Sequence, residues 1–200
     1  MRSLIQQMPL MFPLEVRSCL SEPEIDKIVS GFETYPEKVE NGLIGIGADA
    51  RQNQDVRRVK ILFLDYDFMI KEKIAESISN LIAQVEQLNR ESFMFDITDA
   101  ETLQVLKYTE NDQGFYRRHF DCEAEPTAMC RKLTFIVSLS HPEDYDGGYL
   151  KIDADTNDTD IVMPKGNVMI FPSFLMHQVT PVTRGTRYSL VGWLRGPTFK

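Results

Sequence analysis

The chain has 200 residues, 42% of them hydrophobic, and a formal net charge of −8. This length and composition fit one globular domain, residues 1–200, with a two-layer core, and no second domain is needed. The acidic balance opposes contact with phosphate backbones and anionic lipid, so it argues against nucleic acid or a membrane as the main partner.

Cysteine usage and the first residues bear on the cellular compartment. The three cysteines are Cys19, Cys122 and Cys130, an odd number without paired zinc-type spacing, which disfavours a disulfide framework and favours a reducing compartment. Glutamines and prolines interrupt the apolar residues of segment 1–16, so it does not read as an export signal. No apolar stretch is long enough to span a bilayer, and we expect a cytoplasmic location.

The first 88 residues are expected to supply helical support and a substrate loop. Residues 12–16 read as a short edge strand, and a helix over 22–35 follows, with Ser21 and Glu24 at capping-box spacing. Segment 38–58 is rich in glycine and polar residues without a sustained period, which predicts a mobile loop. Its fragment 45–50 is weakly similar to a dinucleotide fingerprint, but the polar run after it disfavours that interpretation. Apolar residues at helical spacing predict one long amphipathic helix over 66–88 that backs a sheet.

Beyond residue 89, turn residues separate short apolar runs. These runs predict strands at 93–97, 103–108, 133–139, 149–152, 168–171 and 188–194. Many short strands at close spacing favour a sandwich or jelly roll over a parallel sheet. The acidic segment 153–160 lacks the ligand order of a calcium loop and is expected to be a solvated turn.

The residues with the clearest chemistry are His119 and Asp121, followed far downstream by His177. On a strand, side chains two residues apart project from one face, so His119 and Asp121 can bind one metal ion. His177 would be the third ligand. Two imidazoles and one carboxylate without a thiolate match the facial triad of non-heme Fe(II). His141, in a turn-like segment, has no partner at a useful spacing. Cys122 adjoins the proposed ligand Asp121 and is expected to be prone to oxidation.

Three runs carry a family resemblance across roughly residues 89–194. YTENDQGFYRRHFD, DYDGGYLKI and FPSFLMHQVTPVTRGTRYSLVGW resemble, in order, the 2-oxoglutarate and Fe(II)-dependent dioxygenases, particularly the prolyl 4-hydroxylase-type branch. The resemblance implies a mainly β fold with supporting α-helices, built on a double-stranded β-helix (a cupin-like jelly roll) over residues 89–200. It also implies Fe(II), 2-oxoglutarate and O2 as reactants, with ascorbate as a reductant.

The resemblance assigns roles to further residues. Arg187 starts a strand-like run, where a buried guanidinium needs an anion; the family uses a basic residue there for the distal carboxylate of 2-oxoglutarate. Tyr108 matches the tyrosine that meets the same carboxylate, and Ser189 is expected to assist. Many prolyl 4-hydroxylases carry Lys where this chain has Arg187. The residues matched to the substrate region are Tyr116, Arg131 and Trp193.

Two glycines, Gly147 and Gly148, are expected to serve a tight strand entry that needs permissive backbone angles.

The expected activity is hydroxylation of a peptidyl proline or a similar protein side chain, with succinate and carbon dioxide as co-products. A free amino acid or other small metabolite is the alternative substrate class. Base repair is disfavoured, because the nucleic-acid-demethylating relatives carry Asn and Arg where this chain has Ser189 and Trp193. A non-catalytic cupin-like binding protein, or an isomerase with another metal, is opposed by the complete triad and Arg187. The sequence does not choose the primary substrate, the position of hydroxylation or the oligomeric state.

Overall fold

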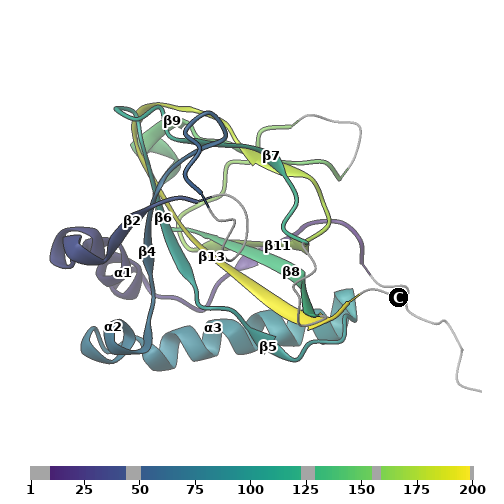
Figure 1. Ribbon diagram of the computed structural model, residues 1–200. Helices are drawn as coiled ribbons and strands as arrows, with labels where there is room; N and C mark the ends of the chain where they lie inside the picture. The colour runs from purple at the N-terminus through teal and green to yellow at the C-terminus, as the bar shows by residue number, and fades with distance from the viewer. Residues whose placement is uncertain (1–9, 44–50, 123–128, 155–158, 199–200) are drawn as a thin grey trace, which may run out of the picture.

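The computed structural model describes residues 10–43, 51–122, 129–154 and 159–198. Two antiparallel sheets and a helical layer make up the molecule (Figure 1). The larger sheet has the order β1-β11-β8-β13-β6-β4-β2, and β5 and β9 also pair with β13. The smaller sheet has the order β10-β12-β7-β3. This architecture is the predicted double-stranded β-helix, or jelly roll, with supporting helices.

The strands of the larger sheet come from both halves of the chain. They are β1 (Leu14–Arg17), β2 (Val39–Asn41), β4 (Lys60–Phe63), β5 (Asp99–Ala100), β6 (Gln104–Thr109), β8 (Met129–Ser138), β9 (Tyr145–Gly147), β11 (Asn167–Pro172) and β13 (Val182–Pro197). The smaller sheet contains β3 (Arg57–Arg58), β7 (Phe115–His119), β10 (Leu150–Ile152) and β12 (His177–Val179). Residues 1–88 therefore supply strands as well as helices.

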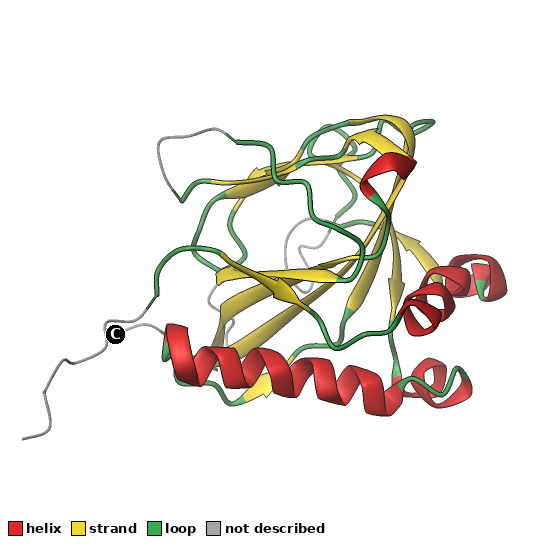
Figure 2. Cartoon of the chain, turned by 180° about the vertical axis from the view of Figure 1, so that it is seen from behind, coloured by secondary structure: helices red, strands yellow, loops and turns green. Residues whose placement is uncertain are grey.

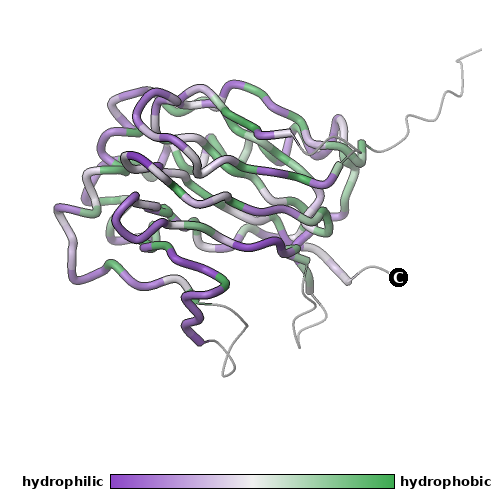
Figure 3. Tube along the Cα trace, turned by 90° about the horizontal axis from the view of Figure 1, so that it is seen from above, coloured by the Kyte–Doolittle hydropathy of each residue, from purple (hydrophilic) through white to green (hydrophobic). Residues whose placement is uncertain are grey.

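The larger sheet is apolar on both faces because it is covered on both. Along β8, Leu133, Phe135 and Val137 pack toward the helices, whereas Ile136 packs toward the smaller sheet. Strand β13 alternates in the same way. Side chains two residues apart share a face of a strand, so these apolar runs fill two separate core layers. In Figure 3 many of the apolar stretches accordingly run through the interior of the molecule.

The helices lie on one side of the larger sheet (Figure 2). They are α1 (Glu22–Thr34), α2 (Tyr66–Lys71) and α3 (Ala75–Leu88). Short 3₁₀ turns lie at Pro36–Lys38 and, next to β9, at Pro142–Asp144. The capping box of α1 is confirmed, since the Ser21 backbone N–H donates to Glu24 Oε2 at 2.8 Å. None of the helices in the described ranges has the length and apolar character of a membrane-spanning segment.

The single long helix predicted over 66–88 is wrong. Asp65 caps α2 by accepting a hydrogen bond from the Phe68 N–H at 2.8 Å. The helical path is interrupted at Lys73, whose φ is +57°. The buried stripe belongs to α3 and the residue before it, with Ile74, Ile78, Leu81 and Val85 all buried. Ile70, which the periodic pattern included, is half exposed. The spacing of apolar residues gives no signal for a residue in the left-handed conformation between two helices.

Two other expectations are corrected. No strand forms at 93–97: Phe93 ends a π-helical turn, Asn89–Phe93, and residues 94–98 have no regular secondary structure. The Asn89 side chain holds this segment by bonding both backbone groups of Phe95, at 2.9 and 3.0 Å. The mobile loop at 38–58 contains strands β2 and β3, which pair with β4 and β7. The dinucleotide-like fragment 45–50 lies outside the described residues, and so does part of the acidic segment 153–160.

Candidate metal centre

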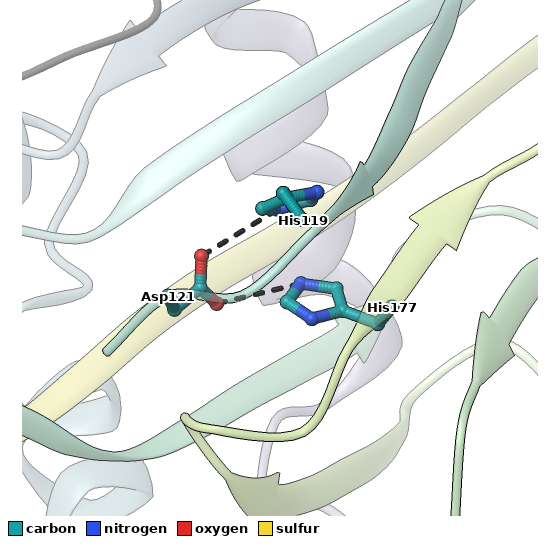
Figure 4. A group of neighbouring side chains, drawn as sticks. All are labelled: His119, Asp121 and His177. Atoms are coloured by element: carbon teal, nitrogen blue, oxygen red, sulfur yellow. Dashed lines mark ion pairs between the residues drawn. The ribbon is translucent and has the colours of Figure 1, made fainter. Parts of the chain in front are cut away.

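The two histidines of the predicted triad lie on neighbouring strands of the smaller sheet. His119 is the last residue of β7 and His177 the first of β12, and the two residues pair across the antiparallel ladder. Their ring centroids are 4.2 Å apart. Figure 4 shows both rings beside Asp121. The sheet register thus brings together two residues separated by 58 positions in the sequence.

Asp121 joins the histidines by a route that differs from the prediction. It does not share a strand with His119, because β7 ends at His119. Instead, the backbone N–H groups of Asp121 and Cys122 both donate to the Ser173 carbonyl, at 2.9 and 3.0 Å. These bonds fix the turn that brings the carboxylate to 3.5 Å from His119 Nε2 and 3.4 Å from His177 Nε2. All three candidate ligand atoms lie within 4.8 Å of one another.

Backbone carbonyls orient both rings. His119 Nδ1 lies 2.8 Å from the Arg117 carbonyl, and His177 Nδ1 lies 3.0 Å from the Leu175 carbonyl. A carbonyl only accepts, so each Nδ1 carries the proton and donates it. Each Nε2 therefore keeps its lone pair and points toward Asp121. This is the tautomer that a metal-binding histidine needs.

Asp121 is held by two further donors. Its Oδ2 accepts from Thr134 Oγ1 at 2.9 Å and from Trp193 Nε1 at 3.0 Å, and Ser173 Oγ lies 3.0 Å from Thr134 Oγ1. Thr134 is on β8 and Trp193 on β13, so the larger sheet positions a carboxylate whose partners lie in the smaller sheet. Oδ1 accepts neither of these bonds and is available to a cation.

The charge states suit a divalent metal. Burial raises the pKa of Asp121, but the adjacent His177 and His119 and the Trp193 N–H outweigh burial and hold it well below the usual range. Burial lowers the pKa of His177. An ionised carboxylate and a neutral imidazole are the forms that coordinate metal. Two nitrogens and one oxygen, with no thiolate among the ligands, fit Fe(II) with open positions.

The predicted co-substrate residues form a buried group beside the centre. Arg187, Ser189 and Tyr108 are all less than 5% exposed. Arg187 pairs with Tyr108 across β13 and β6, its guanidinium carbon lies 5.5 Å from the Tyr108 ring centroid, and its Nη1 donates to Ser189 Oγ at 3.2 Å. Within the described ranges, no carboxylate lies within 4.0 Å of Arg187. A buried cation of this kind is a receptor for an anion.

Two glycines form the tight turn beside this arginine. Gly147 and Gly148 have φ values of +71° and +59°, as the expected strand entry requires. A Cβ on Gly148 would lie 3.1 Å from Arg187 Cδ and 2.8 Å from a methyl group of Val182. The glycine therefore leaves room for the arginine stem.

The three residues matched to the substrate region separate into two groups. Tyr116 stacks on His119, with centroids 3.6 Å apart and planes at 20°. Trp193 is buried, and its indole N–H donates to Asp121. The guanidinium carbon of Arg131 lies 3.8 Å from the Trp193 ring centroid. The same guanidinium donates to both carboxylate oxygens of Glu101, at 2.7 and 2.8 Å. A substrate role for the three stays a prediction. The contacts of Trp193 and Arg131 support the carboxylate of Asp121.

Two other residues are placed as follows. His141 precedes a 3₁₀ turn, outside the cluster formed by His119, Asp121 and His177. Burial raises the pKa of Cys122 to about 11, and the neighbouring Cys130 contributes in the same direction. Little thiolate therefore forms at neutral pH, which opposes the expected oxidation.

Sequence reasoning missed Thr134, Ser173 and Arg57. Thr134 is a fully buried polar residue inside the apolar run 133–139, and that interruption was a usable signal. Arg57 lies over the Tyr116 ring, 4.5 Å from its centroid, and belongs to a segment assigned to a loop. No local pattern marks it, since it reaches Tyr116 through the pairing of β3 with β7.

Comparison with protein families and curated proteins agrees with this geometry. Residues 103–195 match the model of the 2OG-Fe(II) oxygenase superfamily. A PKHD-type hydroxylase from Synechococcus sp. is 43% identical over 67 residues, which cover 34% of this chain and 30% of the relative. Another, from Picosynechococcus sp., is 30% identical over 125 residues, covering 62% and 57%. The matched segments span less than two thirds of these relatives.

Solved structures share the fold over nearly the whole chain. A prolyl-4-hydroxylase from Pseudomonas putida aligns with a TM-score of 0.68 and 20% identity, covering 95% of this chain and 94% of that one. A prolyl hydroxylase from Trichoplax adhaerens, in complex with a hypoxia inducible factor peptide fragment, has a TM-score of 0.71 and 18% identity, covering 92% and 83%. At these identities the likeness establishes the fold.

Proposed function

We propose, because residues 103–195 match the model of the 2OG-Fe(II) oxygenase superfamily, that this protein hydroxylates a peptidyl proline or a similar protein side chain. Succinate and carbon dioxide would be the co-products. The observation that carries the proposal is the pairing of a His119–Asp121–His177 cluster with the buried Arg187, which has no carboxylate partner within the described ranges. The first suits the metal and the second an anionic co-substrate.

The chain's own residues prepare the reaction. His119, Asp121 and His177 would hold Fe(II), which supplies the activation of dioxygen when bound. Arg187 and Tyr108 would bind the distal carboxylate of 2-oxoglutarate and set its distance from the metal. Tyr108 keeps its proton, since burial raises its pKa, and its hydroxyl can therefore donate to that carboxylate. The apolar layer between the two sheets excludes water from this side of the centre.

The choice of a prolyl substrate rests on the named relatives and structures. The two solved enzymes described above are called prolyl hydroxylases, and one of them is in complex with a peptide fragment. A free amino acid or small metabolite is the competing substrate class. The proposal also includes a single catalytic domain over residues 1–200, ascorbate as a reductant and a cytoplasmic location, which rest on the sequence alone.

The test is conversion of 2-oxoglutarate to succinate and carbon dioxide by the purified protein with Fe(II). We expect slow turnover without substrate and faster turnover with proline-containing peptides. If 2-oxoglutarate is not consumed under any of these conditions, the protein is not this kind of oxygenase. If a free amino acid stimulates succinate release and no peptide does, the small-metabolite assignment replaces the prolyl one. Mass spectrometry of the stimulating compound should show the gain of one oxygen.

A further inference from the structure

A basic cavity of about 280 Å³ lies between β3, β4 and the end of β2. Arg57, Arg58 and Lys60 line it, and we call it the basic cavity. One carboxylate among its lining residues, that of Asp112, accepts a hydrogen bond from Thr109 Oγ1 at 2.9 Å. Three cations face one acid in a chain whose net charge is −8. The local charge is therefore opposite to that of the whole molecule.

The three cations are bonded to uncharged acceptors. Arg57 Nη1 donates to the Leu43 carbonyl at 3.0 Å, and Arg58 Nε to the Gln54 carbonyl at 2.8 Å. Lys60 Nζ donates to Asn41 Oδ1 at 2.6 Å. Across the described residues, no carboxylate oxygen comes within 4.0 Å of any of the three.

One donor of Arg57 has no acceptor among the described residues. Arg57 Nε is buried and makes no hydrogen bond within that part of the chain. A buried N–H on a cation without an acceptor is costly unless a ligand completes it. Carboxylates and phosphates are the ligands that the planar guanidinium fork fits.

The basic cavity is connected to the metal centre through two ring contacts. The Arg57 guanidinium lies over one side of Tyr116, and the Tyr116 ring stacks on His119. A group that binds Arg57 is therefore close to a substrate held at the metal centre. The cation proposed above for the co-substrate is a different residue, Arg187, which is buried on β13. The basic cavity therefore fits a part of the other substrate.

We propose that the basic cavity binds an acidic side chain, aspartate or glutamate, of the protein substrate, next to the residue that is hydroxylated. This inference rests on the proposed function and adds a substrate class to it: prolyl sites flanked by acid. The acidic net charge of the enzyme would repel such a segment at long range. Charge-assisted bonds inside the cavity offset that repulsion and select the acidic sequence.

The experiment uses two labelled peptides of equal length that contain proline. One carries glutamates on both sides of the proline and the other carries glutamines at the same positions. Their affinities for the protein loaded with Mn(II) and 2-oxoglutarate are measured by fluorescence anisotropy. We expect the glutamate peptide to bind about tenfold more tightly, as a charge-assisted pair does relative to a neutral one.

Variants assign the preference to the basic cavity. Arg58→Gln and Lys60→Gln should each reduce the difference, and the triple variant that also carries Arg57→Gln should remove it. Lys27→Gln, the same change of charge on the exposed face of α1, should leave it intact. Succinate formation by the unsubstituted protein reports on the proposed function independently of this comparison.

Three results would overturn the inference. The first is equal affinity of the two peptides, including no detectable binding of either. The second is a preference for glutamate that persists in the triple variant. The third is displacement of the glutamate peptide by an equal concentration of inorganic phosphate, which would assign the basic cavity to a free anion.

Discussion

At the residue scale, each candidate ligand has one polar atom occupied by the protein and one left for the metal. The Nδ1 atoms of His119 and His177 donate to carbonyls, and Asp121 Oδ2 accepts from Thr134 and Trp193. The atoms that remain face one another. Such outer contacts fix the tautomer and orientation before the metal arrives.

The first prediction concerns the ligands. His119→Ala, Asp121→Ala and His177→Ala should each abolish binding of Fe(II), because three donors are the whole protein contribution among the described residues. Mn(II) titration by calorimetry measures this without turnover. His141→Ala, in a turn outside the cluster, should bind Mn(II) like the unsubstituted protein. Undiminished affinity in His177→Ala would disprove the triad.

The second prediction concerns Trp193, whose indole N–H bonds Asp121 at 3.0 Å. Trp193→Phe keeps an aromatic ring for Arg131 but removes the donor, and Mn(II) affinity should fall by about 10-fold, as for other groups that orient a ligand. Tyr188→Phe, on the same strand but packed toward the helices, is the matched control. If Trp193→Phe and Tyr188→Phe bind Mn(II) equally well, the indole does not position Asp121.

The third prediction concerns the co-substrate anion. Arg187→Ala should weaken 2-oxoglutarate binding by about 2–5 kcal/mol, because a buried carboxylate loses its charged partner. Tyr108→Phe should cost about 1 kcal/mol, the size of one hydrogen bond. Binding to the Mn(II)-loaded variants is measured by calorimetry. Arg184 and Arg195 are poor substitutes, since each is paired with an aspartate at 2.6 Å. Wild-type affinity in Arg187→Ala would make its role structural.

At the scale of elements, the metal centre is a product of strand register. His119 and His177 meet because β7 and β12 pair, and Arg187 meets Tyr108 because β13 and β6 pair. The sequence predicted the residue types and most strands of the larger sheet, because alternation and apolar runs are local signals. It missed the separate path of Asp121, which depends on the Ser173 carbonyl, and the break between α2 and α3 at Lys73.

The fourth prediction belongs to the tight entry between β9 and β10. Gly148→Ala should destabilise the fold by about 1–3 kcal/mol, the usual cost of a strained backbone residue, because φ is +59° there. Its Cβ would also press on the Arg187 stem, so 2-oxoglutarate affinity should fall while Mn(II) affinity stays unchanged. Urea unfolding and the two titrations separate these effects. An unchanged 2-oxoglutarate affinity would show that Gly148 serves the turn alone.

At the scale of the whole molecule, the candidate metal joins the two sheets. His119 and His177 belong to the smaller sheet, whereas Asp121 is held by Thr134 and Trp193 of the larger one. A cation bound to all three would link these layers in addition to the apolar contacts between them. Because a preformed site is absent from the unfolded chain, the binding free energy adds to the free energy of unfolding.

The fifth prediction follows from that linkage. Mn(II) at 100 times its dissociation constant should raise the free energy of unfolding by about 2.7 kcal/mol. For a chain of this length, that corresponds to an increase in Tm of roughly 5–10 °C. Thermal unfolding followed by circular dichroism, with and without Mn(II), measures the shift. His177→Ala should show none, while His141→Ala should show the full shift. An equal shift in His177→Ala would mean that Mn(II) stabilises the protein from another site.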